Sequence, residues 1–262
     1  MRTRFCSKTI IRLFILLIFT LSASIVYAID ANSIVGVWTL DEGQGDDVMD
    51  SSGNENHGEN SGAQWVDGVS STALEFDGVS HVNIPASDTT DDIEDGFTYM
   101  LWVMPTGTPP NANTRIIERD WHNPTIQIGA TDFYGSIAVN ADQANTNVRG
   151  GLWAMNEWSF VALTYDGESL RLYVDGEMVG EKEVGTPDAQ SNNAPAPYQN
   201  AIWLGAWKAP GWDFTGVIDE VAIFNVALSD DEIVSIMNNG ISEVLSVESI
   251  GKMSVTWGFI KN

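Results

Sequence analysis

The chain has 262 residues, with 12 lysines and arginines against 36 aspartates and glutamates, and a formal net charge of −24. So acidic a surface repels phosphate backbones and anionic lipid, which argues against nucleic-acid or membrane-surface binding. The single cysteine, Cys6, lies near the N-terminus, so the chain must be held together by its core, with or without a metal, rather than by disulfides.

The first 28 residues have the pattern of a secretory signal peptide. Four basic residues and no acid precede or flank an apolar run at residues 13–19, which is too short to span a bilayer comfortably. Val26 and Ala28 occupy the small-residue positions that signal peptidase recognises, so we expect a mature chain that begins at Ile29. An uncleaved N-terminal anchor is the alternative, although no stop-transfer pattern supports it.

Cleavage at this point leaves eight basic and 36 acidic residues, a net charge of −28. We expect the mature protein to be secreted, periplasmic or held at the cell surface, without insertion into a membrane. The remaining 234 of the 262 residues suffice for one large domain that buries about 70 to 75% of its unfolded surface.

The mature sequence predicts an all-β fold. Short runs rich in Val, Ile, Trp, Tyr and Phe recur between clusters of Gly, Asn, Asp and Pro, which is typical of strands and turns. The expected strands are residues 34–40, 73–76, 81–84, 97–104, 114–118, 125–128, 135–139, 158–165, 169–174, 177–184, 201–204 and 216–224.

Two turns between these strands have a hairpin signature. Asp166-Gly167 and Asp175-Gly176 each supply the Asp-Gly pair that accepts the positive φ of a tight type I′ turn. Apolar residues alternate in the flanking strands, which lets each strand bury one face. Long polar loops are expected at residues 41–62, 88–96, 106–113 and 187–200.

Residues 229–238 are the one stretch with the signals of a helix. Ser229 can serve as N-cap, Glu232 completes a capping box, and Gly240 provides a stop. We therefore expect the domain to cover residues 29–240 and a short tail to cover residues 241–262. The tail could add an edge strand or contact a neighbouring protein, and both alternatives stay open.

Five segments, taken in order, resemble the laminin-G-like jelly-roll domains of the concanavalin-A-like superfamily. They are VWTLDEGQGDDVMDSSGNENHG at 37–58, ALEFDGVSHVNIP at 73–85, FTYMLWVMP at 97–105, EWSFVALTYDGESLRLYVDGEMV at 157–179 and FTGVIDEVAIFNVALSDDEI at 214–233. Each segment alone is a weak pattern, and their shared order makes the match specific. The resemblance covers about residues 34–240. It implies a sandwich of two antiparallel sheets with about a dozen strands, and it places the first strand beside residues 216–224.

The resemblance also implies a structural calcium ion. A domain of this kind often holds one calcium between its loops and the last strand, and Asp50, Asp77 and Asp219 lie in the motifs DSSG, FDG and IDE. Acids next to glycine can supply the carboxylate and carbonyl oxygens that calcium prefers. The alternative is that Asp50 and Asp77 cap turns without any ion. Further candidate ligands are Asp41, Glu42 and Glu220.

The chain has ten tryptophans, which fall into two groups. Those in motif strands are expected in the core: Trp38, Trp102 and Trp158. Others sit among Asn, Asp and Lys in segments rich in loop formers, where flat aromatic faces could stack on a sugar ring. These candidate ligand-binding residues are Trp121, Trp207 and Trp212. The alternative is that they cover the core of the sandwich.

No catalytic residues are expected. Sugar-cleaving relatives place two carboxylates on one strand face as E-x-D-x-E, and no such triplet occurs here. Glu118 and Asp120 have the first spacing, but the next alternate residue is His122. Neither the arginine-rich strand nor the Gln-x-His strand of the polysaccharide-lyase relatives is present, and no phosphate loop, serine elbow or zinc cluster is found.

Taken together, these patterns predict an exported, non-catalytic binding domain. Carbohydrate is the first expected ligand class, with a structural calcium in the fold. The alternative is a protein-adhesion or structural module of a cell-surface or extracellular assembly, and a glycan-cleaving enzyme is the third possibility. Fold-level resemblance alone does not decide among them.

Overall fold

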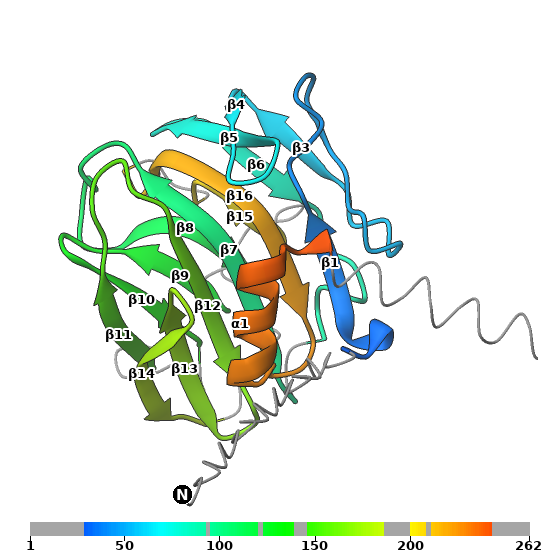
Figure 1. The fold of residues 1–262 in the computed structure, drawn as a ribbon, viewed down its shortest axis with the longest axis vertical. Helices are drawn as coiled ribbons and strands as arrows, with labels where there is room; N and C mark the ends of the chain where they lie inside the picture. The colour runs from blue at the N-terminus through cyan, green and yellow to red at the C-terminus, as the bar shows by residue number, and fades with distance from the viewer. Residues whose placement is uncertain are drawn as a thin grey trace, which may run out of the picture.

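The computed structural model describes residues 29–92, 95–119, 123–138, 146–185, 200–207 and 211–242. The predicted signal peptide, Trp121 and nearly all of the predicted tail lie outside these residues. Within them the chain forms two antiparallel sheets and one α-helix (Figure 1). None of the helices in the described residues is long and apolar enough to cross a membrane.

The first sheet, called sheet A, has eight strands. In spatial order they are β14 (Glu177–Glu183), β13 (Ser169–Val174), β12 (Ser159–Tyr165), β7 (Phe97–Pro105), β16 (Thr215–Phe224), β5 (Thr72–Asp77) and β4 (Gln64–Asp67), with β1 (Ile34–Trp38) also paired to β16.

The second sheet, called sheet B, also has eight strands. Their order is β11 (Asn147–Leu152), β10 (Asp132–Ser136), β9 (Thr125–Ile128), β8 (Thr114–Arg119), β15 (Ile202–Leu204), β6 (His81–Ile84), β3 (Gly58–Ser61) and β2 (Asp47–Val48). The sequence analysis assigned residues 41–62 to a loop, so β2 and β3 are additions to the prediction, and it also placed no strand at β4 or β11.

The main core lies between the two sheets. Alternate residues of the strands face inward, as in Leu170 and Leu172 of β13, and join a cluster that includes Trp38 and Phe76. Burying one face of each strand in this way is the main stabilising term of a sandwich. Trp38 is fully buried, as predicted, whereas Trp102 and Trp158 are only half-buried.

The α-helix α1 (Asp230–Asn239) covers the outer face of sheet A (Figure 1). Ile233 and Ile236 pack there in a second cluster with Met100 and Phe160. The predicted capping is confirmed: the Ser229 hydroxyl and the Glu232 side chain form a capping box. In the described residues a 3-10 helix, Ala31–Ser33, precedes β1.

The first strand pairs with the last one, as the resemblance implies. Val37 of β1 lies opposite Ala222 of β16. The turn predictions fare differently. Asp175 and Gly176 both have positive φ, 53° and 81°, which fits the predicted type I′ turn. At Asp166-Gly167 only Gly167 has positive φ, so a type I′ turn is wrong there.

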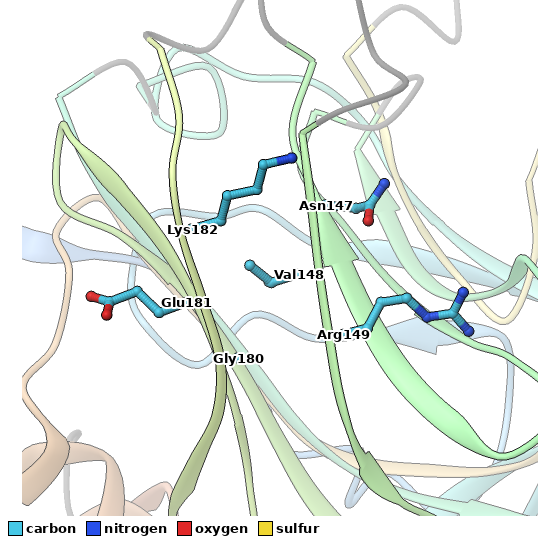
Figure 2. A pocket seen from close by; sticks show the side chains of 6 residues that line it. All are labelled: Asn147, Val148, Arg149, Gly180, Glu181 and Lys182. Atoms are coloured by element: carbon cyan, nitrogen blue, oxygen red, sulfur yellow. The ribbon is translucent and has the colours of Figure 1, made fainter.

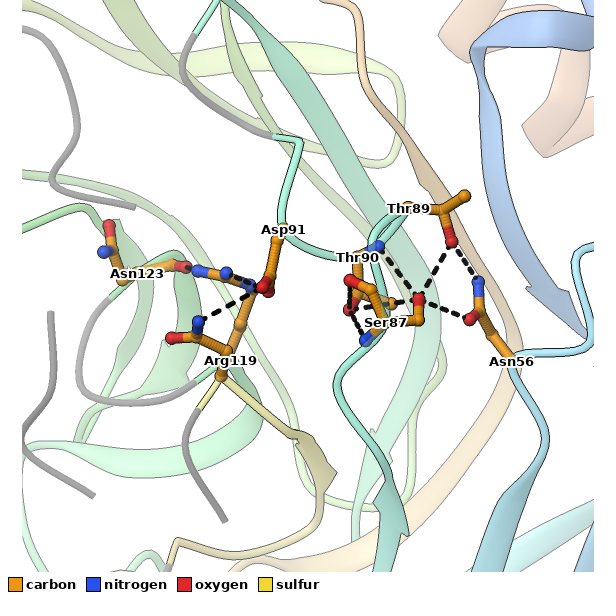
Figure 3. A network of polar contacts seen from close by, with 8 residues as sticks. Asn56, Ser87, Thr89, Thr90, Asp91, Arg119 and Asn123 are labelled. Atoms are coloured by element: carbon orange, nitrogen blue, oxygen red, sulfur yellow. Dashed lines mark hydrogen bonds and ion pairs between the residues drawn. The ribbon is translucent and has the colours of Figure 1, made fainter. Parts of the chain in front are cut away.

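A network of polar contacts ties the loop after β6 to β8 and to the loop before β3 (Figure 3). Arg119 of β8 is fully buried, and its guanidinium donates to the Asp91 carboxylate at 2.5 Å and to the Asn123 carbonyl at 3.0 Å. At the other end of the loop, the Ser87 hydroxyl donates to the Asn56 side chain at 2.7 Å. The network holds the loop in place. Its contacts explain why Arg119 is buried, and no role in ligand binding is needed to explain it.

Candidate functional site

Trp207 and Trp212 lie against each other at one end of sheet B. Their ring centroids are 6.5 Å apart and the rings are nearly perpendicular, at 89°. Both side chains are half-buried, so each leaves part of its ring in contact with solvent. The structure thus brings together two of the three predicted ligand-binding tryptophans, and Trp121 lies outside the described residues.

Both rings are held on one buried arginine. The Arg115 guanidinium carbon lies 5.8 Å from the ring centroid of Trp207 and 5.1 Å from that of Trp212. Cation–π contacts of this kind contribute about 0.5 to 2 kcal/mol each. Arg115 itself is fixed by an ion pair with Glu118 and a hydrogen bond to the Gln127 side chain. The tryptophan pair is therefore oriented by a network beneath it.

The backbone of the tryptophan segment is tied to β8. The Arg115 amide donates to the Trp212 carbonyl at 2.8 Å, and the Gly205 amide donates to the Ile116 carbonyl at 2.8 Å. Gly205 has φ of +77°, and a Cβ there would collide with the Phe76 ring at 2.2 Å. Glycine is therefore required where the segment leaves β15. A segment anchored in this way can present its rings in a fixed arrangement.

Sequence reasoning missed Arg115 as part of this site. Its signal was present, because an arginine within the apolar strand sequence TRIIER must either reach solvent or find partners. Only 2% of Arg115 is exposed, so it bonds with partners inside the protein. One partner, Glu118, lies in the same strand. The others, Gln127 of β9 and the tryptophan segment, could not be read from the local pattern.

Asp50 serves as a buried turn residue. Its carboxylate accepts hydrogen bonds from the amides of Val37, Ser52 and Asn56 at 2.8 to 3.0 Å, and from the Ser52 hydroxyl at 2.8 Å. The bond from Val37 joins the loop to β1, and the other three lie within the loop. They engage both carboxylate oxygens, which fits the alternative in which Asp50 holds a turn without an ion.

Asp77 caps the turn between β5 and β6. One oxygen accepts from the amides of Val79 and Ser80 at 3.1 and 3.0 Å. Hydrogen bonds from Ser80 are the main reason that the pKa of Asp77 is lowered. Asp77 pairs with Thr215 in the sheet, four residues before Asp219 on β16, so the structure does not bring these two predicted calcium ligands together.

Asp219 is the predicted ligand in the most unusual setting. It is fully buried on β16, and its carboxylate accepts from the amides of Val69 and Ser70 at 2.8 and 3.2 Å. Burial, together with the neighbouring Glu220 carboxylate, raises the pKa of Asp219 to about 7. Burial and the Asp41 charge raise the pKa of Glu220 as well. Three acids thus interact around one turn.

One backbone oxygen lies close to the Asp219 carboxylate. A Cβ built on Gly68 would lie 2.5 Å from Asp219 Oδ2 and 2.7 Å from the Thr72 carbonyl oxygen, so both oxygens lie beside Gly68. Nearby, the second carboxylate oxygen of Glu42 is buried and has no hydrogen-bond partner. Among the described residues, however, no three acidic, cysteine or histidine side chains converge as a metal centre. Side chains alone therefore do not complete a site here.

Glu118, the acid examined for glycosidase chemistry, is fully buried and paired with Arg115. Of the neighbouring positions, Arg119 is committed to Asp91, and Asp120 and His122 lie outside the described residues. The described part of the strand thus presents an ion pair in place of two cooperating carboxyl groups.

Comparison with solved structures shows the same fold. Domain 4 of AbnA, a GH43 extracellular arabinanase from Geobacillus stearothermophilus solved with arabinotriose, is 20% identical with a TM-score of 0.57. The match covers 78% of this chain and 98% of that domain. The binding domain of Paraclostridial Mosquitocidal Protein 1 is 15% identical with a TM-score of 0.64, over 80% of this chain and 52% of that one.

The binding domain of botulinum neurotoxin DC, solved in complex with SialylT, is 15% identical with a TM-score of 0.59, over 80% of this chain and 52% of that one. The chain thus spans about half the length of the toxin domains. A search of curated protein sequences gave no significant match. The family model described as the concanavalin A-like lectin/glucanases superfamily matches residues 76–234, more than half of the chain. The chain therefore belongs to the concanavalin A-like lectin/glucanases superfamily.

Proposed function

We propose that this protein is an exported carbohydrate-binding domain and that Trp207 and Trp212 form its sugar-stacking surface. The observation that carries the proposal is the pair of half-buried rings held at a right angle on the buried Arg115. Aromatic faces of this kind stack on pyranose rings, while nearby polar groups bind the hydroxyls. Asn111 lies at this end of the sheet and donates to the Gly211 carbonyl.

The solved neighbours support the choice of ligand class. The arabinanase domain is matched over nearly its whole length and was solved with arabinotriose, and a toxin binding domain was solved with SialylT. Their sequence identities are too low to transfer a site residue by residue. They support carbohydrate as the ligand class, and we propose the tryptophan pair as the place where this chain would bind it.

Calcium is proposed as a structural ion bound near Asp219. The supporting observations are the buried acids of β16 and the Thr72 carbonyl oxygen, which lies beside Gly68 as Asp219 Oδ2 does. Calcium accepts a mixture of carboxylate, carbonyl and water oxygens. Asp50 and Asp77 are left out of this proposal because each caps a turn elsewhere in the fold. The ion would offset buried negative charge and would take no part in chemistry.

We propose a non-catalytic role because Glu118, the acid on the best candidate strand, is locked in an ion pair. Export is proposed on the signal-peptide pattern, with a mature chain that begins at Ile29. Intact-mass measurement of the protein recovered from its native compartment tests the start site. A mass that still includes residues 1–28 would contradict cleavage.

Replacing Trp207 or Trp212 with alanine tests the stacking surface. Each variant should lose binding to the sugars that the wild-type chain recognises, while its melting temperature falls by a few degrees at most, because the rings are half-buried. Isothermal titration calorimetry and thermal unfolding measure the two effects separately. A large loss of stability in both variants would return these residues to the core and remove the argument for a sugar site.

Trp65 offers a matched control. It lies on β4 in sheet A, whereas the tryptophan pair lies beside sheet B. It is also half-buried, and its indole N–H donates to the Gly45 carbonyl at 2.9 Å. Trp65→Ala should lower stability to a similar degree and leave sugar binding unchanged. Loss of binding in this variant too would mean that the tryptophan changes act through the fold.

Protein adhesion is the second candidate. Leu152 is 80% exposed, and Met155 and Met178 are nearly half exposed, so large apolar side chains gather at the ends of β11 and β14. A toxin binding domain of this fold was solved in complex with rat synaptotagmin II. Binding of an extracellular protein that is lost in Leu152→Asp but kept in Trp212→Ala would favour this candidate over sugar recognition.

A further inference from the structure

Sheet B has an outer face that continues beyond the tryptophan pair toward β6. Val82 and Ile84 of β6 pack in the core between the two sheets. Because side chains alternate along a strand, His81 and Asn83 face outward. Trp203 of β15 lies opposite Asn83, and directly opposed residues place their side chains on the same face of a sheet. His81, Asn83 and Trp203 therefore share the outer face of sheet B.

This group lies next to the tryptophan pair. Trp203 lies opposite Glu118 of β8, and Glu118 forms an ion pair with Arg115, on which both rings of the tryptophan pair rest. β15 lies between β6 and β8 in the sheet, so β6 and β8 are two strand spacings apart, about 10 Å. The tryptophan pair and the outward residues of β6 are therefore neighbours on one face.

His81 presents an aromatic ring on this face. Its ring centroid lies 5.1 Å from that of Trp203, and the two ring planes are inclined at 46°. Trp203 is almost completely buried, whereas His81 is only half-buried. The buried tryptophan thus supports the histidine ring and leaves part of it in contact with solvent. A flat ring held in this way can pack against a sugar ring.

Asn83 contributes a hydrogen-bond donor beside this ring. Its side chain is half-buried, and its Nδ2 atom has no hydrogen-bond partner in the described part of the chain. Amide groups in such places normally have partners, because an unmade hydrogen bond is costly. The opposite position on β3 holds Glu59, which is exposed. A carboxylate there disfavours an acidic ligand, so the amide suits the hydroxyl oxygen of a neutral sugar.

The opposite side of the tryptophan pair offers less to a ligand. Gln127 lies opposite Arg115, and Tyr134 lies opposite Gln127; both are almost completely buried. Arg149 follows on β11, and Figure 2 shows its side chain pointing away from β14. Its guanidinium is already paired with Asp132 and lies over the Tyr134 ring. Among the described residues, the accessible continuation of the pair therefore runs toward β6.

We propose that the ligand is a linear, neutral oligosaccharide that runs from the tryptophan pair toward β6, where His81 and Asn83 form a second subsite. The inference rests on the proposed function, because it extends the same binding surface. One sugar ring would stack on the tryptophan pair. A later ring of the chain would pack against His81 and accept a hydrogen bond from the Asn83 amide. A single ring cannot bridge the two places, so chain length determines affinity.

Titration calorimetry of the whole chain with the linear hexasaccharides of glucose, xylose, galactose and mannose, and with each free monosaccharide, tests the inference. The hexasaccharide that binds should do so at least about tenfold more tightly than its monosaccharide, equivalent to about 1.4 kcal/mol. His81→Ala should remove this gain, whereas His81→Phe, which keeps an aromatic ring, should retain most of it. Asn83→Asp replaces the amide donor with an acceptor and should weaken hexasaccharide binding as well.

Arg149→Ala is the matched control, because Arg149 is exposed on the same face but on the other side of the tryptophan pair. It should leave hexasaccharide binding unchanged. Equal affinity for hexasaccharide and monosaccharide, or a loss in Arg149→Ala in place of His81→Ala, would overturn the inference. If Trp212→Ala still removes binding in that case, the stacking surface stands without the second subsite.

Thermal unfolding of each variant separates binding from packing. If His81→Ala loses hexasaccharide binding together with a large fall in melting temperature, and His81→Phe restores stability without restoring binding, the histidine ring has a packing role alone and the inference fails. If the wild type binds none of these sugars, the second subsite and the proposed stacking surface fail together.

Discussion

Replacing Asp50 with alanine should destabilise the fold strongly, because its carboxylate accepts three hydrogen bonds within its loop and one from β1. The amides of Val37 and Asn56 lie in buried residues, at 0% and 4% exposure, and would lose their acceptors. An unsatisfied buried donor costs about 1 to 3 kcal/mol. The two together should cost about 2 to 6 kcal/mol of unfolding free energy.

Urea unfolding of the wild type and of Asp50→Ala measures this cost directly. For a domain of this size each kcal/mol corresponds to about 2 to 4 °C in melting temperature, so a loss of at least about 4 °C is expected. The loss should be the same in calcium and in chelator, since protein amides occupy the oxygens. Asp50→Asn keeps one acceptor oxygen, so its unfolding free energy should lie between those of the wild type and Asp50→Ala. A loss below about 1 kcal/mol, or one confined to calcium solutions, would refute the structural role.

Three further predictions follow from the same structure. Calcium should raise the melting temperature more than magnesium does, and a chelator and Asp219→Ala should each remove the difference; a hundredfold excess over Kd is worth about 2.7 kcal/mol, and equal shifts with both ions would mean charge screening alone. Burial favours a higher pKa for Asp166, but hydrogen bonds from Arg171 and the turn outweigh it and lower the pKa from 3.8 to about 2. The Asp166–Arg171 ion pair therefore stabilises the fold above about pH 4 and loses its effect as the pH falls toward 2. Arg171→Gln should flatten that part of the acid-unfolding curve. An unchanged curve would show that the ion pair is too exposed to affect stability. The chain should release no reducing ends from β-glucans or galactans and no unsaturated product from alginate, and product that disappears in Glu118→Gln would show that the strand is catalytic.

Much of the fold could be predicted because its signals are local. The capping residues Ser229 and Glu232 determine where the helix begins, and alternation along β12 and β13 determines which side chains face the core. The short strands β2 and β3 could not be predicted in this way. They are polar and depend on pairing with β6, whose residue Asn83 lies opposite Glu59.

The candidate sites show the same division between local and distant information. The motif acids Asp50 and Asp77 form turns whose geometry is set mainly by residues within a few positions. The sequence analysis gave this turn-capping role as the alternative to calcium binding. The tryptophan pair depends on segments that meet only in the folded chain. Arg115 in particular has partners on β9 and in the tryptophan segment, so its role became visible only in three dimensions.

A glycan array probed with the mature chain at millimolar calcium tests the central claim most directly. Sugar recognition through the tryptophan pair predicts a defined set of hits for the wild type, absent when Trp207 and Trp212 are both changed to alanine and kept in Trp65→Ala. An array without hits, or hits that survive the double change, would contradict carbohydrate recognition at this site.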